Sequence, residues 1–223
     1  SGERGIFNRE AARKGIERNV ENRSSQDRQR ETDHNFGTNP CSEIVLRDCE
    51  FCNLTEMVVR ADDTPESLRR KARLATILGT WQSTLTDFRY LSSSWKKNCE
   101  DERLLGVSMT GIMDSDLTNG NTDGLEEMLA DLRDDVVKTN REYAKNLGIE
   151  QSVSTTCVKP SGTVSQLVDA ASGIHARHNP HYIRTVRADN KDPLCQFMKD
   201  QGFPAEACVM KPDNVTVFSF PVK

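Results

Sequence analysis

The chain has 223 residues, of which 35% are hydrophobic, 6% aromatic and 29% charged, and its formal net charge is −4. This length can bury a core in one domain or in two small ones. The lean apolar content indicates either a highly charged surface or a core completed by other sequence. The acidic balance argues against a general nucleic-acid binder, because such proteins carry excess lysine and arginine on one face.

The apolar segments and cysteines indicate the compartment. No apolar run approaches the ~20 residues that cross a bilayer, and no hydrophobic leader opens the chain, so no membrane partner is expected. Seven cysteines are an odd number. We therefore expect reduced thiols and a cytoplasmic protein.

The N-terminal residues predict a short helix and a charged segment. Residues 8–15 favour a helix with Asn8 as its cap and Gly15 as its end. An arginine-, asparagine- and serine-rich stretch continues to Asp33 almost without apolar side chains, so most of residues 8–33 is expected to be a mobile charged segment. Its arginines could meet phosphates, but the interleaved carboxylates favour a solvated loop.

Two long helices are predicted around a buried strand. After a short strand at 43–46, Thr64 and Pro65 mark a helix start, because a capping hydroxyl precedes a proline in the first turn. Residues 104–109 indicate a buried strand, and an amphipathic helix runs from Leu125 to Gly148. The first helix has one apolar face that is expected to lie in the core, formed by Leu68, Ala72, Ala75, Leu78, Trp81, Leu85 and Phe88.

The C-terminal third continues the alternation of strands and helices. Residues 153–158 predict a strand, and a serine- and glycine-containing turn leads to a helix at 163–172 that Gly173 closes. Asp192 and Pro193 start a last helix that Gly202 ends. Further strands are expected at 182–187, 207–210 and 215–220. This order predicts an α/β fold with largely parallel strands.

One short segment gathers three reactive side chains. Asn39-Pro40-Cys41-Ser42-Glu43 places an amide, a thiol and a carboxylate within five residues, and Cys52-Asn53-Leu54 adds a second thiol. The segment resembles the active-site finger of ribonucleotide reductases. Residues 159–165, Lys-Pro-Ser-Gly-Thr-Val-Ser, with Ser-Gly-Ile-His at 172–175, are similar to the substrate-phosphate loop of that family. The surrounding sequence, including Ser-Met-Thr-Gly-Ile at 108–112, most resembles the adenosylcobalamin-dependent, single-chain branch that acts on triphosphates.

This resemblance implies a fold. Residues 1–223 would be a partial catalytic domain, part of the ten-stranded α/β barrel of ribonucleotide reductases, with an inward finger loop at 38–54 and a phosphate-binding strand-loop-helix at 153–173. The resemblance covers only the middle of such an enzyme. The chain is therefore expected to be a fragment that is inactive alone, with the effector site and the electron-relaying C-terminal cysteines outside it.

The resemblance also implies roles for four residues. Cys41 matches the thiol that forms a thiyl radical and takes a hydrogen atom from C3′ of the ribose. Glu43 matches the base that accepts the 3′-hydroxyl proton, and Asn39 matches the amide that binds the sugar hydroxyls. Cys52 matches one thiol of the reducing pair, whose partner lies upstream in the family.

The second motif also has a direct physical interpretation. Hydroxyls and a glycine beside backbone N–H groups at a helix start favour an anion. Alone, such a turn is common, and it is not a Walker loop. The residues predicted to bind substrate phosphate are Pro160, Ser161, Gly162, Thr163, Val164 and Ser165.

Other cysteines and histidines have spacings that resemble metal-ligand sets at first sight. Cys49 and Cys52 form a Cys-x-x-Cys, but no second cysteine pair or spaced histidine pair completes a zinc site. Pro180 breaks the common face of the histidines at 175, 178 and 181. No metal site is predicted. The remaining cysteines are interpreted as small hydrophobes that are buried or half-buried: Cys99, Cys157, Cys195 and Cys208.

The predicted function is radical reduction of ribonucleoside triphosphates to 2′-deoxyribonucleoside triphosphates. The resemblance implies adenosylcobalamin as cofactor, thioredoxin or a similar dithiol as reductant, and a deoxynucleotide effector that binds outside this chain. Two alternatives remain open. One is the large subunit of a diiron-dependent ribonucleoside-diphosphate reductase, and the other is a noncatalytic nucleotide-binding domain with regulatory thiols.

Overall fold

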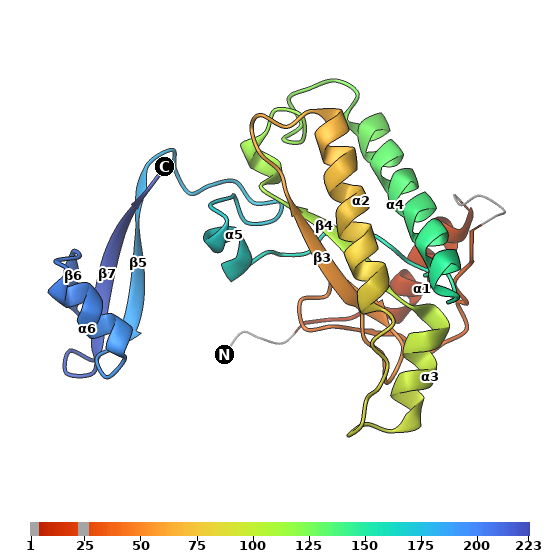
Figure 1. Cartoon of the computed structure of the whole chain (residues 1–223), viewed down its shortest axis with the longest axis horizontal. Helices are drawn as coiled ribbons and strands as arrows, with labels where there is room; N and C mark the ends of the chain where they lie inside the picture. Colours follow the sequence, from red (N-terminus) through yellow and green to blue (C-terminus); the bar gives the residue numbers. More distant parts are fainter. Residues whose placement is uncertain (1–4, 22–26) are drawn as a thin grey trace. The chain divides into compact units, whose positions relative to one another are not determined.

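The computed structural model describes residues 5–21 and 27–223. They divide into two compact units, with the boundary between Ala176 and Arg177 (Figure 1). Both units contain helices and strands, so the predicted mixture of the two is confirmed. None of the helices in these residues is both long and apolar enough to cross a membrane.

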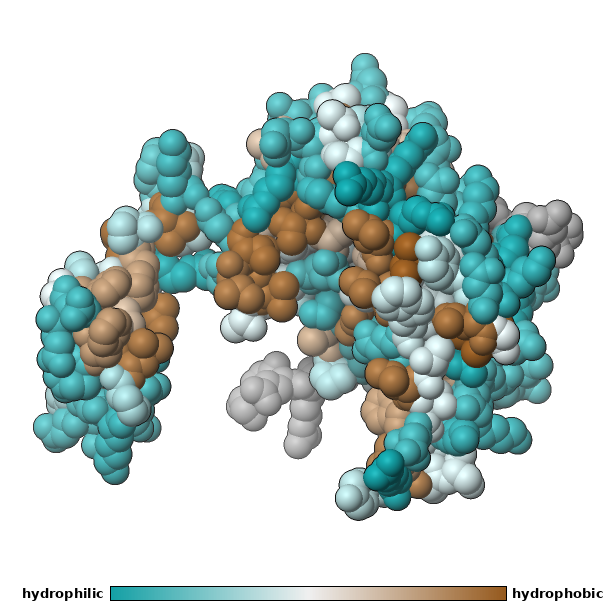
Figure 2. Space-filling model, in the orientation of Figure 1, coloured by the Kyte–Doolittle hydropathy of each residue, from teal (hydrophilic) through white to brown (hydrophobic). Residues whose placement is uncertain are grey.

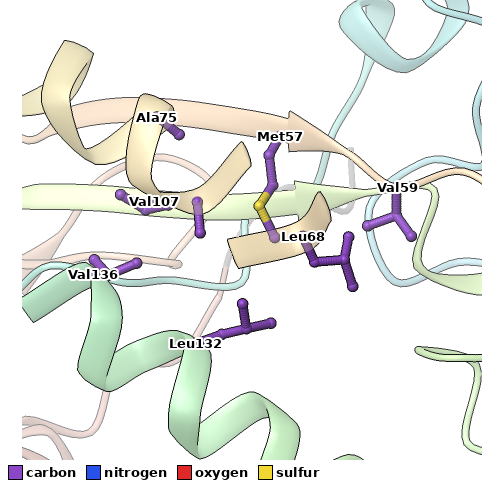
Figure 3. Close-up of a cluster of buried hydrophobic side chains, with 8 residues drawn as sticks. Met57, Val59, Leu68, Ala75, Val107, Leu132 and Val136 are labelled. Atoms are coloured by element: carbon purple, nitrogen blue, oxygen red, sulfur yellow. The ribbon is translucent and has the colours of Figure 1, made fainter. Parts of the chain in front are cut away.

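The core of the first unit lies between a pair of parallel strands and two helices. β3 (Asn53–Val58) pairs with β4 (Leu105–Thr110) along its whole length. The helices α2 (Pro65–Gln82) and α4 (Leu125–Leu147) pack on one face of this pair (Figure 1). The apolar side chains from all four elements meet there (Figure 3): Met57, Val59, Leu68, Ala72, Ala75, Val107, Leu132 and Val136.

The start of α2 follows the sequence prediction. Thr64 caps the helix by accepting the Ser67 N–H at 3.2 Å, and the Ser67 hydroxyl oxygen accepts the Thr64 N–H at 2.9 Å. Reciprocal bonds of this kind satisfy two donors that a helix start leaves unpaired. The capping hydroxyl and the proline therefore set the boundary as expected.

The predicted apolar face of α2 is only partly buried. Its first half lies in the core, but Leu78, Trp81 and Leu85 are 57%, 51% and 72% exposed, and Figure 2 shows apolar surface along this helix. The prediction that the whole apolar face lies in the core is therefore wrong for Leu78, Trp81 and Leu85. The reason is that a pair of strands covers less of a long helix than a wider sheet would.

The connection between α2 and β4 contains a helix that the sequence analysis missed. α3 (Ser93–Glu102) is polar, and its residues Cys99 and Glu102 are buried. A short 3₁₀ turn, Ile112–Asp114, follows β4. The end of α4 agrees with the prediction, because Gly148 ends this helix with a left-handed φ of 67°, which glycine adopts without the steric cost of a Cβ atom.

The N-terminal charged segment is more ordered than predicted. α1 (Arg9–Glu21) begins as expected, because the Asn8 side chain accepts the Ala11 N–H at 3.0 Å, but it continues through Gly15. Arg30 is only 8% exposed, and its guanidinium binds Glu102 at 2.5 Å. The helix prediction is thus correct up to Gly15, and the solvated-loop prediction is wrong for residues 16–21, which continue the helix, and for Arg30. Residues 22–26 of that segment lie outside the described part.

The segment after α4 runs beside β4 without forming a regular strand. The Leu105 N–H donates to the Ser154 carbonyl at 3.0 Å, and the Cys157 N–H donates to the Val107 carbonyl at 3.1 Å. Val107 and Thr156 form an isolated parallel bridge. The predicted helix at 163–172 is shorter than expected, because α5 spans only Thr163–Leu167. The finger region contributes a small hairpin of β1 (Gly37–Thr38) and β2 (Val45–Leu46).

The second unit is an antiparallel sheet with one helix. Its strands lie in the order β5 (Tyr182–Asp189), β7 (Val215–Val222), β6 (Ala205–Ala207), and all pairs are antiparallel. The predicted helix start is correct, because Asp192 caps α6 (Pro193–Asp200) at the Leu194 N–H. The expectation of largely parallel strands is therefore wrong for this unit and holds for β3 and β4.

Candidate active site

The predicted finger is a tight hairpin turn between β1 and β2. The Ser42 N–H donates to the Asn39 carbonyl at 3.0 Å, and the Ile44 N–H donates to the Asn39 side-chain oxygen at 3.1 Å. Ser42 has a left-handed φ of 64°, a conformation that non-glycine residues adopt mainly in tight turns and at functional sites. The turn leaves Cys41 exposed at its tip.

The finger packs on the face of β3 that points away from α2 and α4. Successive side chains of a strand point to opposite faces, and Met57 belongs to the core under the helices. Cys52, Leu54 and Glu56 therefore share the opposite face. Cys52 and Leu54 pack there against the small cluster that contains Ile44 of the finger. The structure thus brings the finger and the predicted redox thiol together.

The finger carboxylate lies close to two thiols. Burial raises the pKa of Cys52 well above its ordinary value, and Cys157, Glu50 and Glu43 raise it further, against a smaller effect of Arg30. Burial also raises the pKa of Cys157 to about 12, with the Glu43 charge as the next cause. Both thiols are therefore protonated at neutral pH. One oxygen of Glu43 is buried and has no hydrogen-bond partner among the described residues.

A cluster of buried charges lies behind Cys52. Arg30 and Arg47 both bind Glu102, at 2.5 and 2.7 Å, and Arg30 lies 3.7 Å from Glu50. Glu50 also accepts the Arg47 N–H at 2.8 Å. Burial, and then the neighbouring Glu102 carboxylate, raise the pKa of Glu50 to about 8, while the Arg47 N–H and the Arg30 charge oppose this shift. The cluster fixes the chain that leads into β3.

Cys49 and Cys52 have different surroundings although they form a Cys-x-x-Cys. Cys49 is half-buried at a turn with a left-handed φ of 54°, whereas Cys52 packs into the cluster beneath the finger. All seven cysteines are free thiols. Within residues 5–21 and 27–223, no three histidine, cysteine, aspartate or glutamate side chains gather as a metal-binding group.

The predicted phosphate loop lies at the other end of the same face of β3. The buried Ser161 donates its hydroxyl to Glu56 at 2.8 Å, and the buried Ser165 donates to the Gly162 carbonyl at 2.6 Å. Those two hydroxyls are thus used within the protein. The predicted residues that remain exposed are Pro160, Gly162, Thr163 and Val164.

Two residues of this face were not identified from the sequence. Cys157 was interpreted as a buried or half-buried hydrophobe without a role in the site; it is half-buried, as Cys52 is, and packs against the cluster beneath the finger. Glu56 was given no role. Strand alternation offered a signal for Glu56, since it lies four residues after Cys52 and so on the same face. The other three cysteines, Cys99, Cys195 and Cys208, are buried as predicted.

Comparisons with known proteins support the sequence resemblance. No protein-family model matches the chain. The adenosylcobalamin-dependent ribonucleoside-triphosphate reductase of Lactobacillus delbrueckii subsp. bulgaricus is 32% identical in an alignment of 212 positions, and the match covers 84% of this chain and 28% of the relative. The enzyme of the same name from Euglena gracilis is 30% identical in an alignment of 190 positions, and the match covers 84% of this chain and 25% of the relative.

A solved structure agrees with these relatives. A crystal structure of a B12-dependent, class II ribonucleotide reductase matches with a TM-score of 0.68 and 29% identity, over 84% of this chain and 29% of that chain. The chain thus spans little more than a quarter of the length of the proteins that it matches. Over most of its own length, this chain is homologous to a part of the adenosylcobalamin-dependent ribonucleotide reductases.

Proposed function

We propose that this chain is the part of a ribonucleoside-triphosphate reductase that carries the radical thiol, one redox thiol and the substrate-phosphate loop. The observation that supports this most is the hairpin that exposes Cys41 between Asn39 and Glu43 and packs beside Cys52. A ribose placed over that tip would meet a thiol, an amide and a carboxylate at once.

In the proposed reaction, a thiyl radical on Cys41 takes the hydrogen atom from C3′ of the ribose. Glu43 accepts the 3′-hydroxyl proton, for which its buried oxygen without a protein partner is suited. The side-chain oxygen of Asn39 closes the turn, so its NH₂ group is the part left to bind a sugar hydroxyl. The 2′-hydroxyl then takes a proton from the reducing thiol pair and leaves as water, and Cys41 finally returns the hydrogen atom to C3′.

Cys52 supplies reducing equivalents in this scheme. Two thiols give up two hydrogen atoms in total and end as a disulfide, which thioredoxin or a similar dithiol reduces again. The raised pKa of Cys52 keeps this thiol protonated, and so able to donate hydrogen, until the substrate radical forms. We place its partner thiol outside this chain, as in the family resemblance.

Adenosylcobalamin is the proposed cofactor, following the names of the relatives. When bound, it supplies an organic radical that removes the hydrogen atom of a thiol. The exposure of Cys41 fits this requirement, because the sulfur is accessible from outside the hairpin. We assign the task of holding the cofactor to no described residue, and place that task in the remainder of the protein.

The triphosphate is proposed to bind at the loop of Pro160 to Ser165. Its exposed residues present backbone N–H groups and the Thr163 hydroxyl, which are donors suited to phosphate oxygens. The first unit would then be part of the ten-stranded α/β barrel of the family, with the finger and the loop on one inward face. The deoxynucleotide effector would bind outside this chain.

The test is reduction by the intact protein that contains this chain. With adenosylcobalamin, a ribonucleoside triphosphate and a dithiol, it is expected to form the 2′-deoxyribonucleoside triphosphate. Activity only on diphosphates and only with a separate radical-supplying subunit would instead identify the diiron-dependent class. Nucleotide binding without any reduction under either condition would identify a noncatalytic domain and overturn the proposal.

A further inference from the structure

Strand β3 and the residues just after it hold the phosphate loop at two points. The first is Glu56, which faces the finger side of the strand and accepts the Ser161 hydroxyl at 2.8 Å. Ser161 is only 5% exposed, and its carbonyl in turn accepts a hydrogen bond from the Ser172 hydroxyl. The bond between Glu56 and Ser161 therefore fixes the beginning of the loop to the strand that starts after Cys52.

The second point is Arg60, just beyond the end of β3. Its guanidinium donates to the carbonyls of Val168 and Asp169, the latter at 2.6 Å. These carbonyls follow the short helix α5, and Asp169 has a left-handed φ of 47°. A fork of two donors on consecutive carbonyls holds such a chain reversal more firmly than a single donor would.

Arg60 is itself held in place by a charged pair. Its backbone N–H donates to the Asp63 carboxylate at 2.8 Å, and that carboxylate binds the Lys71 ammonium at 2.6 Å. Lys71 also donates to the Val58 carbonyl at 2.8 Å, at the end of β3. The guanidinium is therefore attached to a fixed turn between β3 and α2.

The groups that the loop exposes lie between these two points. Ser165 is fully buried and bonds within the loop, so the residues predicted to bind phosphate that face solvent between these points are Gly162, Thr163 and Val164. Neither Glu56 nor Arg60 belongs to that exposed part. Glu56 also keeps its second carboxylate oxygen buried without a hydrogen-bond partner among the described residues. Such a group costs stability, so the hydrogen bond with Ser161 is the contact that offsets the burial of this carboxylate.

We propose that Glu56 and Arg60 are positioning residues for the substrate-phosphate loop, acting through Ser161 and through the Val168 and Asp169 carbonyls. This inference rests on the proposed function of the loop. It makes β3 and the turn after it a single rigid support that sets the phosphate site relative to Cys52 and the finger.

The experiment uses the intact reductase and compares Glu56→Ala with Glu56→Gln. The amide of glutamine still offers an oxygen to Ser161, whereas alanine does not. We expect Glu56→Ala to raise the KM for the ribonucleoside triphosphate on the order of tenfold while kcat changes far less, and Glu56→Gln to restore the KM. Inhibition by inorganic tripolyphosphate should weaken in parallel with the KM, because that probe binds only through phosphate.

Arg60→Met is the second variant, and Arg70→Met, a change at an exposed arginine of α2, is its matched control. Hydrogen exchange of a peptide that covers residues 159–169 is measured in each variant, because this readout does not depend on turnover. We expect faster exchange in Arg60→Met and Glu56→Ala, and unchanged exchange in Arg70→Met and Glu56→Gln. Unchanged exchange in both Arg60→Met and Glu56→Ala would overturn the inference.

Gly162→Val separates the two proposals. If it raises the KM but Glu56→Ala does not, the phosphate site stands and the positioning role is wrong. If neither variant changes the KM or the inhibition by tripolyphosphate, the phosphates bind elsewhere and both proposals fail. A KM that rises equally in Glu56→Ala and Glu56→Gln would also contradict the positioning role, because the Ser161 contact would then not be the cause.

Discussion

The backbone of Gly106 lies so close to Leu54 that a Cβ atom on it would stand 2.4 Å from the Leu54 Cδ2 atom. The same atom would stand 3.0 Å from the Cys157 sulfur and 3.3 Å from Cδ1 of Ile44. Glycine is required here for space, since its φ is not in the left-handed region. The side chains of Leu54, Cys157 and Ile44 can therefore hold their present positions over β4 because Gly106 beneath them lacks a side chain.

Gly106→Val is expected to displace the finger. Forcing a branched side chain into this contact costs about 1–3 kcal/mol, because the side chains of Leu54, Cys157 and Ile44 must shift to make room for it. We expect loss of nucleotide reduction with faster hydrogen exchange in residues 38–46. Gly37→Ala is the control, because a Cβ there meets nothing within 4 Å. Normal activity in Gly106→Val would mean that the finger does not depend on this packing.

The three thiols near the finger are expected to differ in function. Cys52→Ser should stop multiple turnover with a dithiol or thioredoxin, because it removes one member of the reducing pair. Cys49→Ser should be mild, since Cys49 lies at a turn outside the packed cluster. Cys157→Ala should also sustain turnover. These rates are measured with excess reductant. Equal loss in Cys49→Ser and Cys52→Ser would instead indicate a local disulfide between those two residues.

The charged cluster behind Cys52 predicts a pH-dependent stability. Burial is the main cause that raises the pKa of Glu50 from an ordinary value of 4.5 to about 8. The folded state therefore binds more protons than the unfolded state between these two values, so local stability falls as the pH rises through that window. Below pH 4.5 both the folded and the unfolded state hold the proton, so stability no longer changes with pH through Glu50.

Glu50→Gln is expected to flatten this dependence, because the amide keeps the shape of the side chain and cannot ionise. Hydrogen exchange of residues 45–54 in the intact protein, corrected for the intrinsic effect of pH, measures it. Glu150→Gln is the control at an exposed glutamate. If local stability in Glu50→Gln falls with pH as steeply as in the unchanged protein, a group other than Glu50 titrates in this region.

Glu43→Gln is expected to slow reduction by about 10²–10⁴-fold, the range for loss of a general base. Glutamine retains the size of the side chain, so the affinity for the triphosphate should stay nearly constant. Single-turnover rates and nucleotide binding are measured on the same preparation. A variant that loses affinity and keeps its rate would show that Glu43 binds substrate without acting as a base.

The sequence predicted local features better than long-range ones. The start of α2 was predictable because Thr64, Pro65 and Ser67 act within one turn. The end of α1 was not, because a glycine inside a helix costs only about 1 kcal/mol, and Ile16, which is buried directly after Gly15, supports its continuation. The antiparallel pairing of β5 and β7 was also missed, since alternation of elements does not specify strand direction.

In the candidate site, too, local features were easier to predict than long-range contacts. The finger motif was predictable because Asn39, Cys41 and Glu43 lie within five residues. The contact between Glu56 and Ser161 joins residues 105 positions apart, and no local pattern in either segment indicates it. Arg30 was misjudged for the same reason, because its carboxylate partner, Glu102, lies 72 positions away.

Cys41→Ser in the intact enzyme tests the central claim most directly. Serine is nearly isosteric, but its O–H bond is too strong to exchange hydrogen with a sugar C–H bond. With adenosylcobalamin, a ribonucleoside triphosphate and a dithiol present, we expect no deoxyribonucleotide above background and unchanged nucleotide binding. Formation of deoxyribonucleotide by this variant, at any rate above background, would contradict the assignment of Cys41 as the hydrogen-abstracting thiol.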